Sequence, residues 1–583
     1  MKVFLELGWF FKQEKKAYIS GIFILLFVAL LQLVPPRVIG VIADHINDGT
    51  LTKGLLFEWM AILVAAGLGM YVLRFFWRIM IFGSAVKLSR QLRNRLYQHF
   101  TNMSPSFYQK RRTGDLMAHA TNDLSAIQQT AGAGVLTLVD SLSTGGMVLL
   151  AMAFTISWKL TLICLIPMPF MAILTNWFGT MLHKTFYKAQ EAFSDLNDKT
   201  QESISGIKVI KTFGQEKEDI EDFRKQSEDV VQKNIVVAKI DSLYDPTISI
   251  IVGISFFLAI TFGSKYVLAG ELSIGELISF TTYLGLLIWP MLAFGWLFNI
   301  VERGRASYDR VAALLREKSD ITDKSDALDV VPSGGIHYEI ENFTFPGEKE
   351  PLIKDISFSI NRGETLGIVG KTGAGKTTLL KLLIREFEDY QGGITFGDHP
   401  LQKYKMEKLR EAIGYVPQDH FLFSATVAEN IAFTNPNAPR EEIYNAAKLA
   451  YIHEDILQFT EGYETIVGER GVSLSGGQKQ RISIARALMM NPEVLILDDS
   501  LSAVDAKTEE AILSALRKNR DGKTTIITSH RLSAIQHANL ILVLDQGKVI
   551  ERGTHEDLMV TGGWYKEMYL RQQLEELVEH GGH

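Results

Sequence analysis

Gly370-Lys-Thr-Gly-Ala-Gly-Lys376-Thr377 is the stretch that decides the fold of the C-terminal half of this 583-residue chain. It matches the phosphate-binding pattern G-x-x-x-x-G-K-[ST] at every position. An apolar run, 364–369, precedes it and predicts a strand, and the run 377–387 after it predicts a helix. Glycines let backbone N–H groups curl around a phosphate, and the helix adds the positive end of its dipole. The stretch therefore predicts an α/β domain that binds a nucleoside triphosphate.

The same stretch predicts how the triphosphate and its metal are held. Lys376 would neutralise the β- and γ-phosphates, and the hydroxyl of Thr377 would ligate Mg²⁺. Val494-Leu-Ile-Leu-Asp498 predicts a second buried strand ending in a carboxylate, as expected for the Mg²⁺-holding acid of a P-loop ATPase. We expect ATP and Mg²⁺ as cofactors, with nucleotide contacts from Gly370, Lys371, Thr372, Gly373, Ala374, Gly375, Lys376, Thr377 and Thr378.

A second anion-binding sequence, Leu474-Ser-Gly-Gly-Gln478, lies between these two elements. A serine and two glycines at the start of a predicted helix expose backbone N–H groups to an anion. The pentapeptide resembles the signature of ABC ATPases. That resemblance implies that the residues cover the γ-phosphate bound to the opposite subunit of a dimer; they are Ser475, Gly476, Gly477 and Gln478.

Further motifs resemble those of ABC ATPases and follow in the family's order, which a lone Gln or His would not indicate. The resemblance implies that Gln418 contacts Mg²⁺ or water as the Q-loop glutamine, and that His530 contacts the γ-phosphate as the switch histidine. Ser502-Ala-Val-Asp505 resembles the D-loop at the dimer interface. Glu469, in Val467-Gly-Glu-Arg470, resembles an exporter-specific segment that touches the coupling loops.

Two positions depart from the family pattern. Phe345 stands where most relatives have a Tyr that stacks on adenine; stacking needs only the aromatic face, so Phe345 can still serve. Asp499 stands where most relatives have the Glu that acts as general base. Because Asp is one methylene shorter, and a misplacement near 1 Å can cost about 10²-fold in rate, we expect this site to bind Mg-ATP but hydrolyse it slowly.

The N-terminal half predicts a membrane domain. Six stretches are long and apolar enough to cross a bilayer, at about 17–43, 55–82, 134–157, 159–182, 247–269 and 274–300. The long polar links 84–133 and 183–246 carry clustered Lys and Arg, so the positive-inside rule places them and both termini in the cytosol. The first apolar stretch is too long for a signal peptide. We predict a multi-pass protein of the bacterial plasma membrane.

The predicted fold class is a membrane α-helical bundle of six transmembrane helices with long cytosolic extensions, fused to an α/β P-loop ABC ATPase domain. The expected boundaries are a transmembrane domain at 1–312, a linker at 313–332 and the nucleotide-binding domain at 333–583. In the long links, Phe107–Leu116 and Glu202–Lys211 resemble the coupling-loop segments of type IV ABC exporters.

Ionisable residues within the predicted spans leave two interpretations open. Asp140 either lines a translocation cavity and attracts cationic substrates, or anchors neighbouring helices through hydrogen bonds. For Arg74 and Arg78 we favour a span that extends beyond the lipid. Pro290 is expected to bend the sixth span.

Composition excludes several classes of protein. A net charge of −6 with 22% charged residues describes neither a nucleic-acid binder nor a disordered chain. The single cysteine, Cys164, allows neither an intrachain disulfide nor a thiol-based metal site. Membrane lipid is the expected surrounding of the N-terminal half.

Over almost its whole length the chain resembles the catalytically altered subunit of heterodimeric multidrug exporters of Gram-positive bacteria. The residues that carry this resemblance include Thr113–Ala118, Leu136–Ser141, Tyr415–His420 and Asp498–Thr508. It implies ATP-driven efflux of amphipathic drugs, with a second half-transporter that carries the catalytic Glu as the partner. Export of a lipid or peptide, and a nucleotide-binding regulatory subunit, remain as alternatives.

Overall fold

The computed structural model describes residues 2–468 and 472–580. The chain divides into two compact units. One comprises Met1–Asn102 and Arg111–Glu317, and the other comprises Met103–Lys110 and Lys318–His583. The short segment Met103–Lys110, predicted as part of the transmembrane domain, therefore groups with the ATPase residues.

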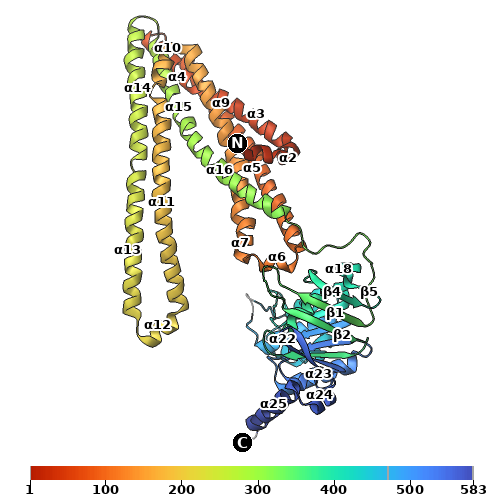
Figure 1. Ribbon diagram of the computed structural model, residues 1–583. Coiled ribbons are helices and arrows are strands. Elements are labelled where there is room, and N and C mark those ends of the chain that lie inside the picture. Colours follow the sequence, from red (N-terminus) through yellow and green to blue (C-terminus); the bar gives the residue numbers. More distant parts are fainter. Residues whose placement is uncertain (1, 469–471, 581–583) are drawn as a thin grey trace. The chain divides into compact units, whose positions relative to one another are not determined.

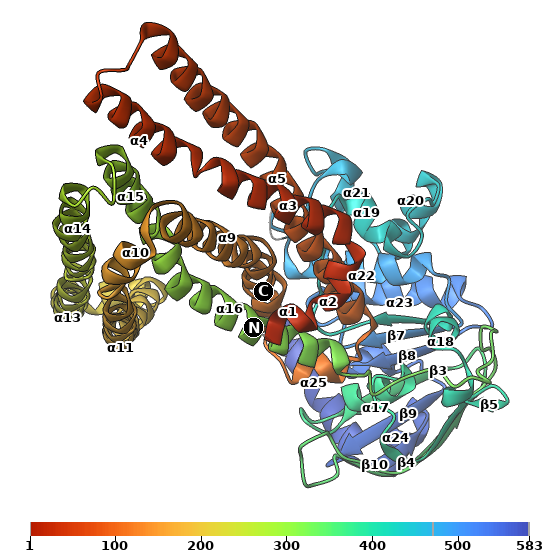
Figure 2. The ribbon, with the colours of Figure 1, turned by 90° about the horizontal axis from the view of Figure 1, so that it is seen from above.

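The first unit is helical throughout (Figure 1). Its α-helices are α1 (Lys2–Glu6), α2 (Gly8–Gln13), α3 (Lys15–Leu31), α4 (Val34–Asn47), α5 (Lys53–Asn102), α7 (Thr113–Ala118), α8 (Leu124–Gln129), α9 (Val135–Ala151), α10 (Trp158–Leu165), α11 (Met168–Ser205), α12 (Ile207–Phe213), α13 (Glu216–Asp241), α14 (Tyr244–Leu268), α15 (Ile274–Leu286) and α16 (Ile288–Arg316). Three π-helical turns, His119–Asp123, Thr130–Gly134 and Met152–Ser157, connect α7 through α10. Long helices pack in pairs: α11 lies along α13, and α3 along α5 (Figure 2).

Five helical segments of this unit are long and apolar enough to cross a membrane, among the described residues: Lys15–Asn47, Lys53–Asn102, Thr113–Leu165, Glu216–Leu268 and Ile274–Arg316. The predicted fourth span, 159–182, is not one of them. It is divided between α10 and α11, with a break at residues 166–167. Pro167 explains the break, because proline has no backbone N–H to donate to the preceding turn of the helix. Six spans therefore remain a prediction.

Two other predicted spans are also interrupted. The first breaks between α3 and α4, just before the pair Pro35-Pro36. The sixth breaks at Leu287, between α15 and α16, three residues before the proline expected to bend it. Polar contacts tie α4 to α15: both oxygens of Asp44 accept hydrogen bonds, at 2.7 Å from the Ser273 hydroxyl and at 2.6 Å from the Gly275 N–H. These contacts satisfy donors at the start of α15.

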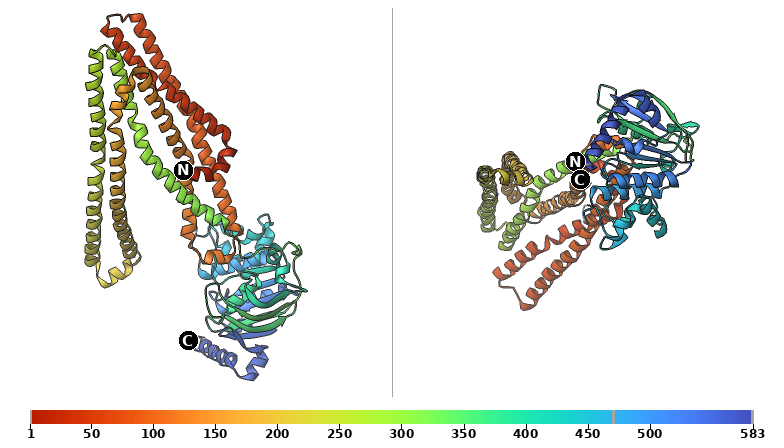
Figure 3. Two further views of the ribbon diagram at one scale, coloured as in Figure 1. Left: turned by 45° about the horizontal axis from the view of Figure 1, so that its top comes forward. Right: turned by 90° about the horizontal axis from the view of Figure 1, so that it is seen from below.

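The second unit is an α/β domain with two sheets (Figure 3). Its strands are β1 (Ile336–Phe343), β2 (Ile353–Ile360), β3 (Thr365–Gly370), β4 (Tyr390–Phe396), β5 (His399–Pro400), β6 (Ile413–Val416), β7 (Val494–Asp498), β8 (Thr524–Thr528), β9 (Leu540–Asp545) and β10 (Lys548–Gly553). The antiparallel sheet has the order β2-β1-β4-β5. The larger sheet has the order β10-β9-β3-β8-β7-β6 and is parallel from β9 to β6.

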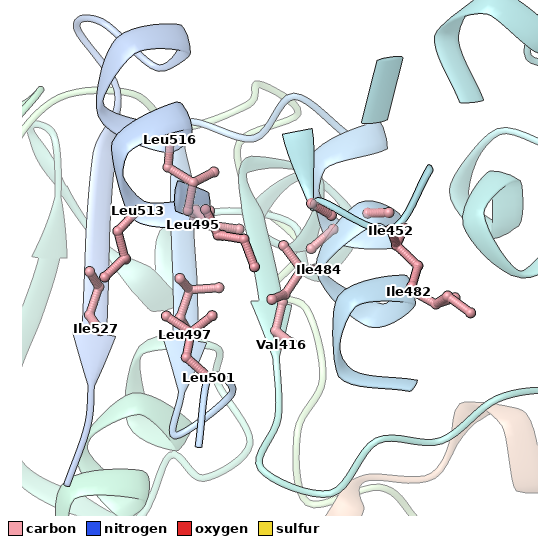
Figure 4. Close-up of a cluster of buried hydrophobic side chains, with 14 of the residues drawn as sticks. Val416, Ile452, Ile482, Ile484, Leu495, Leu497, Leu501, Leu513, Leu516 and Ile527 are labelled. Carbon is pink, nitrogen blue, oxygen red and sulfur yellow. The ribbon is translucent and has the colours of Figure 1, made fainter. Parts of the chain in front are cut away.

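Helices cover both faces of the larger sheet. The α-helices of this unit are α6 (Pro105–Gln109), α17 (Lys376–Leu383), α18 (Met406–Ala412), α19 (Val427–Ile431), α20 (Arg440–Leu449), α21 (His453–Leu457), α22 (Gly476–Met489), α23 (Ala506–Asn519), α24 (His555–Thr561) and α25 (Trp564–His580). Strand β7 is buried along its full length, as a central parallel strand should be. Val494 and Ile496 pack on the side of α17, whereas Leu495 and Leu497 pack on the side of α22 (Figure 4).

The linker predicted at 313–332 begins inside a helix, because α16 continues to Arg316. The first strand of the ATPase unit begins at Ile336. Between them, Leu328 forms an isolated bridge to Tyr404 and attaches this segment to the ATPase unit.

Candidate nucleotide-binding site

The phosphate-binding loop connects β3 to α17, as the sequence predicts. Gly370, Gly373 and Gly375 have φ values of +150°, +82° and +100°, a region that side chains rarely adopt. A Cβ at Gly370 would lie 2.1 Å from the carbonyl oxygen of Leu544, so only glycine fits there. The loop therefore has the backbone that a phosphate cradle requires.

Lys376 is the first residue of α17 and is folded back over the loop. Its Nζ donates to the carbonyl oxygens of Gly370 at 2.8 Å and Lys371 at 3.1 Å. Burial lowers the pKa of the ammonium group, while Asp499 and Asp498 act in the opposite direction. These two carbonyl oxygens are the present hydrogen-bond partners of the ammonium group. A bound phosphate could take their place as its partner.

Asp498 ends β7 and is 1% exposed. Its Oδ1 accepts hydrogen bonds from the Thr377 hydroxyl at 3.1 Å and the Thr528 hydroxyl at 2.8 Å, and its Oδ2 accepts one from the Tyr415 hydroxyl at 3.0 Å. All three partners are neutral, and within residues 2–468 and 472–580 the carboxylate has no ion pair. A buried, unpaired carboxylate beside the Thr377 hydroxyl fits Mg²⁺, which uses one or two carboxylates together with substrate phosphates.

Asp499 continues from β7 in an unusual conformation. Its φ is +47°, a left-handed value that Asp tolerates better than most residues. Its N–H donates to the Thr528 hydroxyl at 2.9 Å, and its Oδ2 accepts from the Gln418 amide at 3.4 Å. Burial raises the pKa of this carboxyl, and nearby His530 opposes that shift. The structure thus brings together Asp499, Gln418 and His530, the three residues predicted for catalysis.

The signature residues lie elsewhere on the domain. Ser475 caps α22: its hydroxyl accepts from the Gln478 N–H at 3.2 Å, and its own N–H donates to the Gln478 Oε1 at 3.1 Å. The Gln478 amide also contacts Asp455 at 3.3 Å. Within the described part of the chain, no hydrogen bond joins Ser475, Gly476, Gly477 or Gln478 to the phosphate-binding loop. Glu469 and Arg470 lie outside the described residues.

Phe345 is half-buried against other aromatic rings. Its centroid lies 5.1 Å from that of Phe343 and 5.3 Å from that of Phe387, both edge to face. These contacts hold the Phe345 ring in place. That the ring stacks on adenine stays a prediction.

Two residues that sequence reasoning gave no role complete the Asp498 environment. Thr528 hydrogen-bonds both Asp498 and the backbone of Asp499, so one hydroxyl orients both acids. Tyr415, on β6, bonds Asp498 and also lines a cavity of about 230 Å³ together with Pro105 of α6. Both residues belong to motifs visible in the sequence, but only the parallel pairing of β6, β7 and β8 brings them to Asp498.

Comparisons with known families agree with this geometry. The family model of the ABC transporter transmembrane region matches residues 18–291, and the ABC transporter model matches residues 353–502. Over 573 residues the chain is 48% identical to the probable multidrug resistance ABC transporter ATP-binding/permease protein YheI of Bacillus subtilis (strain 168), covering 98% of each chain. Over 577 residues it is 48% identical to the multidrug resistance-like ATP-binding protein MdlA of Escherichia coli (strain K12), covering 99% of this chain and 97% of MdlA.

Two further proteins are similar to this chain. The ATP-dependent lipid A-core flippase of Syntrophus aciditrophicus (strain SB) is 33% identical over 495 residues, covering 84% of this chain and 82% of the flippase. The solved structure of a bacterial Atm1-family ABC exporter with ATP bound superimposes with a TM-score of 0.79 at 25% identity. That match covers 96% of this chain and 99% of the exporter chain.

Proposed function

Because this chain belongs to the ABC transporter family and has the exporter arrangement of a transmembrane region and an ATPase in one polypeptide, we propose that it exports amphipathic drugs or other xenobiotics as one half of a heterodimer. ATP hydrolysis coupled to transport is the activity of the family. The names of the relatives YheI and MdlA support multidrug substrates.

The observation that carries the heterodimer is Asp499 beside an intact signature. In the proposed dimer each ATP lies between one chain's phosphate loop and the other chain's signature. Asp499 would impair only the site built on this chain's loop, while Ser475 to Gln478 would complete the partner's site. A homodimer would contain the shortened base in both sites, so an unlike partner with Glu explains why the signature is retained.

We assign the site residues as follows in this proposal. Lys376 and the loop Gly370–Thr378 hold the phosphates, and Phe345 holds the adenine. Thr377 and Asp498 hold Mg²⁺, with Gln418 also near it, and bound Mg²⁺ would neutralise charge on the phosphates. Gln418 and His530 position the attacking water beside Asp499.

The proposed orientation places both termini and the long links in the cytosol of a bacterial cell. Helix α6 then acts as a coupling element between nucleotide state and membrane helices. Support comes from the Ser106 hydroxyl, which donates to Asp320 at 2.5 Å, since Asp320 and α6 belong to the same compact unit as the ATPase residues.

Co-purification with candidate partner half-transporters tests the proposal. The complex should hydrolyse ATP and accumulate dye in inverted vesicles. Glu→Gln at the partner's base should abolish steady-state turnover, whereas Asp499→Asn should leave most of it. A chain that assembles alone and pumps at the full rate would contradict the heterodimer.

Lipid export is the second candidate function. The observation that favours it is the full-length similarity to a lipid A-core flippase. Reconstitution with labelled lipid in place of dye distinguishes the two functions, because a lipid exporter moves the lipid in an ATP-dependent manner and leaves the dye behind.

A further inference from the structure

A large cavity lies among α9, α11 and α16 of the membrane unit. Its volume is about 1170 Å³, above the 300–1,000 Å³ typical of pockets for drug-sized ligands. Much of its wall is apolar and comes from Leu142, Leu149, Leu165, Met171, Met291 and Phe298. The cavity can therefore surround the apolar body of an amphipathic molecule.

One end of this cavity carries positive charge. Lys184 lies 13 residues after Met171 on α11, and Arg303 lies 12 residues after Met291 on α16, which places each cation about 20 Å along its helix from the apolar end. Figure 1 shows both helices running away from the end of the unit where α10 and α15 lie. The two cations therefore sit at the same end.

The acidic group at this end does not neutralise these cations. Glu302 also lines the cavity, but its carboxylate lies 3.7 Å from the guanidinium of Arg305. Among the described residues, Lys184 and Arg303 have no ion pair. Both side chains are exposed, so an anionic group that enters this end of the cavity can pair with them without displacing a carboxylate.

An adjoining cavity has the same sign of charge. It measures about 270 Å³, shares Pro290 with the larger one, and is lined by Arg74 and Arg78 against a single acid, Asp140. Asp140 accepts a hydrogen bond at 3.3 Å from Thr144 on its own helix. Two guanidinium groups outnumber one carboxylate, which argues against the interpretation that Asp140 attracts cationic substrates and leaves the other, a hydrogen-bonded anchor between helices, open.

We propose that the transported molecule is an amphipath with an anionic group, a carboxylate, sulfonate or phosphate, which binds at the end of the cavity lined by Lys184 and Arg303, with its apolar part among α9, α11 and α16. This inference rests on the proposed export function and names its substrate class. A free amphipathic acid and an anionic lipid share the required chemistry.

A matched pair of probes tests the sign of the charge. Pyrenebutanoate and (pyrenylbutyl)trimethylammonium have the same apolar body and opposite charges. With the full-length transporter and its partner in nanodiscs of zwitterionic phosphatidylcholine, we expect pyrenebutanoate to bind at least tenfold more tightly. Equal binding, or preference for the cation, would overturn the proposal without the need for any variant.

Variants then locate the site. Lys184→Met combined with Arg303→Gln should remove the preference for pyrenebutanoate. Lys188→Met, one turn further along α11 and outside the cavity lining, should retain it. An unchanged preference in the double variant would show that the anion binds elsewhere and would overturn the assignment.

Two further measurements ask whether the native anion is a lipid or a free amphipath, and whether the protein exports amphipaths at all. If added phosphatidylglycerol displaces pyrenebutanoate from the wild type, the native anion is a lipid; if it does not, the native anion is a free amphipath. ATP-dependent uptake into inverted vesicles tests export itself. Transport of the cationic probe alone would overturn the anion proposal and leave export standing, whereas failure to transport any amphipath would refute the export function.

Discussion

Asp499→Glu should restore hydrolysis at this chain's own nucleotide site. The extra C–C bond, about 1.5 Å, extends the reach of the carboxylate beyond the present contact with Gln418 at 3.4 Å. A misplacement near 1 Å can change a rate about 10²-fold, which corresponds to about 2.7 kcal/mol of activation free energy. We therefore expect phosphate release from this site to rise by about 10- to 100-fold.

The same substitution should lower stability. Asp499 has a φ of +47°, and a left-handed backbone costs roughly 1–2 kcal/mol for residues without the local hydrogen bonding of Asp or Asn. Replacing Asp by Glu should therefore reduce the free energy of unfolding of the ATPase unit by on the order of 1 kcal/mol. Faster turnover combined with a lower melting temperature would show that Asp tolerates the left-handed backbone at position 499 better than Glu does. It would also show that the Asp carboxylate is too short to act efficiently as the general base.

In the proposed heterodimer, the assay isolates this chain's site by removing the catalytic base of the partner. In a complex whose partner carries Glu→Gln, only the site built on this chain's phosphate loop can turn over. Asp499→Asn in that background is the matched control and should remove the residual rate. If Asp499→Glu did not increase the rate of phosphate release while Mg-ATP still bound, the short side chain of Asp499 would not be the reason for slow hydrolysis.

Three further predictions concern the same site and the membrane helices. Burial raises the pKa of Asp499, so its carboxylate protonates at a higher pH than an exposed Asp, and the residual turnover of this site should fall as pH drops through that raised value. Tyr415→Phe removes the hydroxyl that orients Asp498, and should raise the Mg²⁺ concentration for half-maximal turnover about tenfold; an unchanged Mg²⁺ titration would contradict this. A Cβ at Gly275 would lie 1.9 Å from the Gly40 carbonyl oxygen, so Gly275→Ala should destabilise the membrane unit by about 1–3 kcal/mol in thermal unfolding, whereas Gly67→Ala, with no atom within 4 Å, should not.

Much of the nucleotide site could be predicted because its signals are local in sequence. The phosphate loop needs glycines at fixed offsets between a strand and a helix, and the structure shows positive φ at Gly370, Gly373 and Gly375. The acid after an apolar strand is equally local, as Asp498 at the end of β7 shows. Such patterns depend on backbone geometry over a few residues and need no knowledge of the tertiary fold.

Tertiary neighbours could not be predicted in this way. Tyr415 and Thr528 are far apart in sequence and meet at Asp498 only because β6 and β8 flank β7. The charge of the membrane cavity was also hidden, because Lys184 and Arg303 lie on different helices and the pairing of Glu302 with Arg305 appears only in the structure. The break before α11 did have a signal, Pro167, which a count of apolar residues overlooks.

The phosphate-binding loop and the signature are followed by helices on opposite faces of the ATPase core. Helix α17, which follows the phosphate loop, packs on the face of β7 that carries Val494 and Ile496. Helix α22, which follows the signature, packs on the opposite face with Leu495 and Leu497. Within the described residues no hydrogen bond joins the signature residues Ser475–Gln478 to the phosphate-binding loop. In the proposed dimer a second ATPase domain supplies the missing half, and Asp499 favours a second domain unlike this one, since only an unlike partner leaves one site with a full-length base.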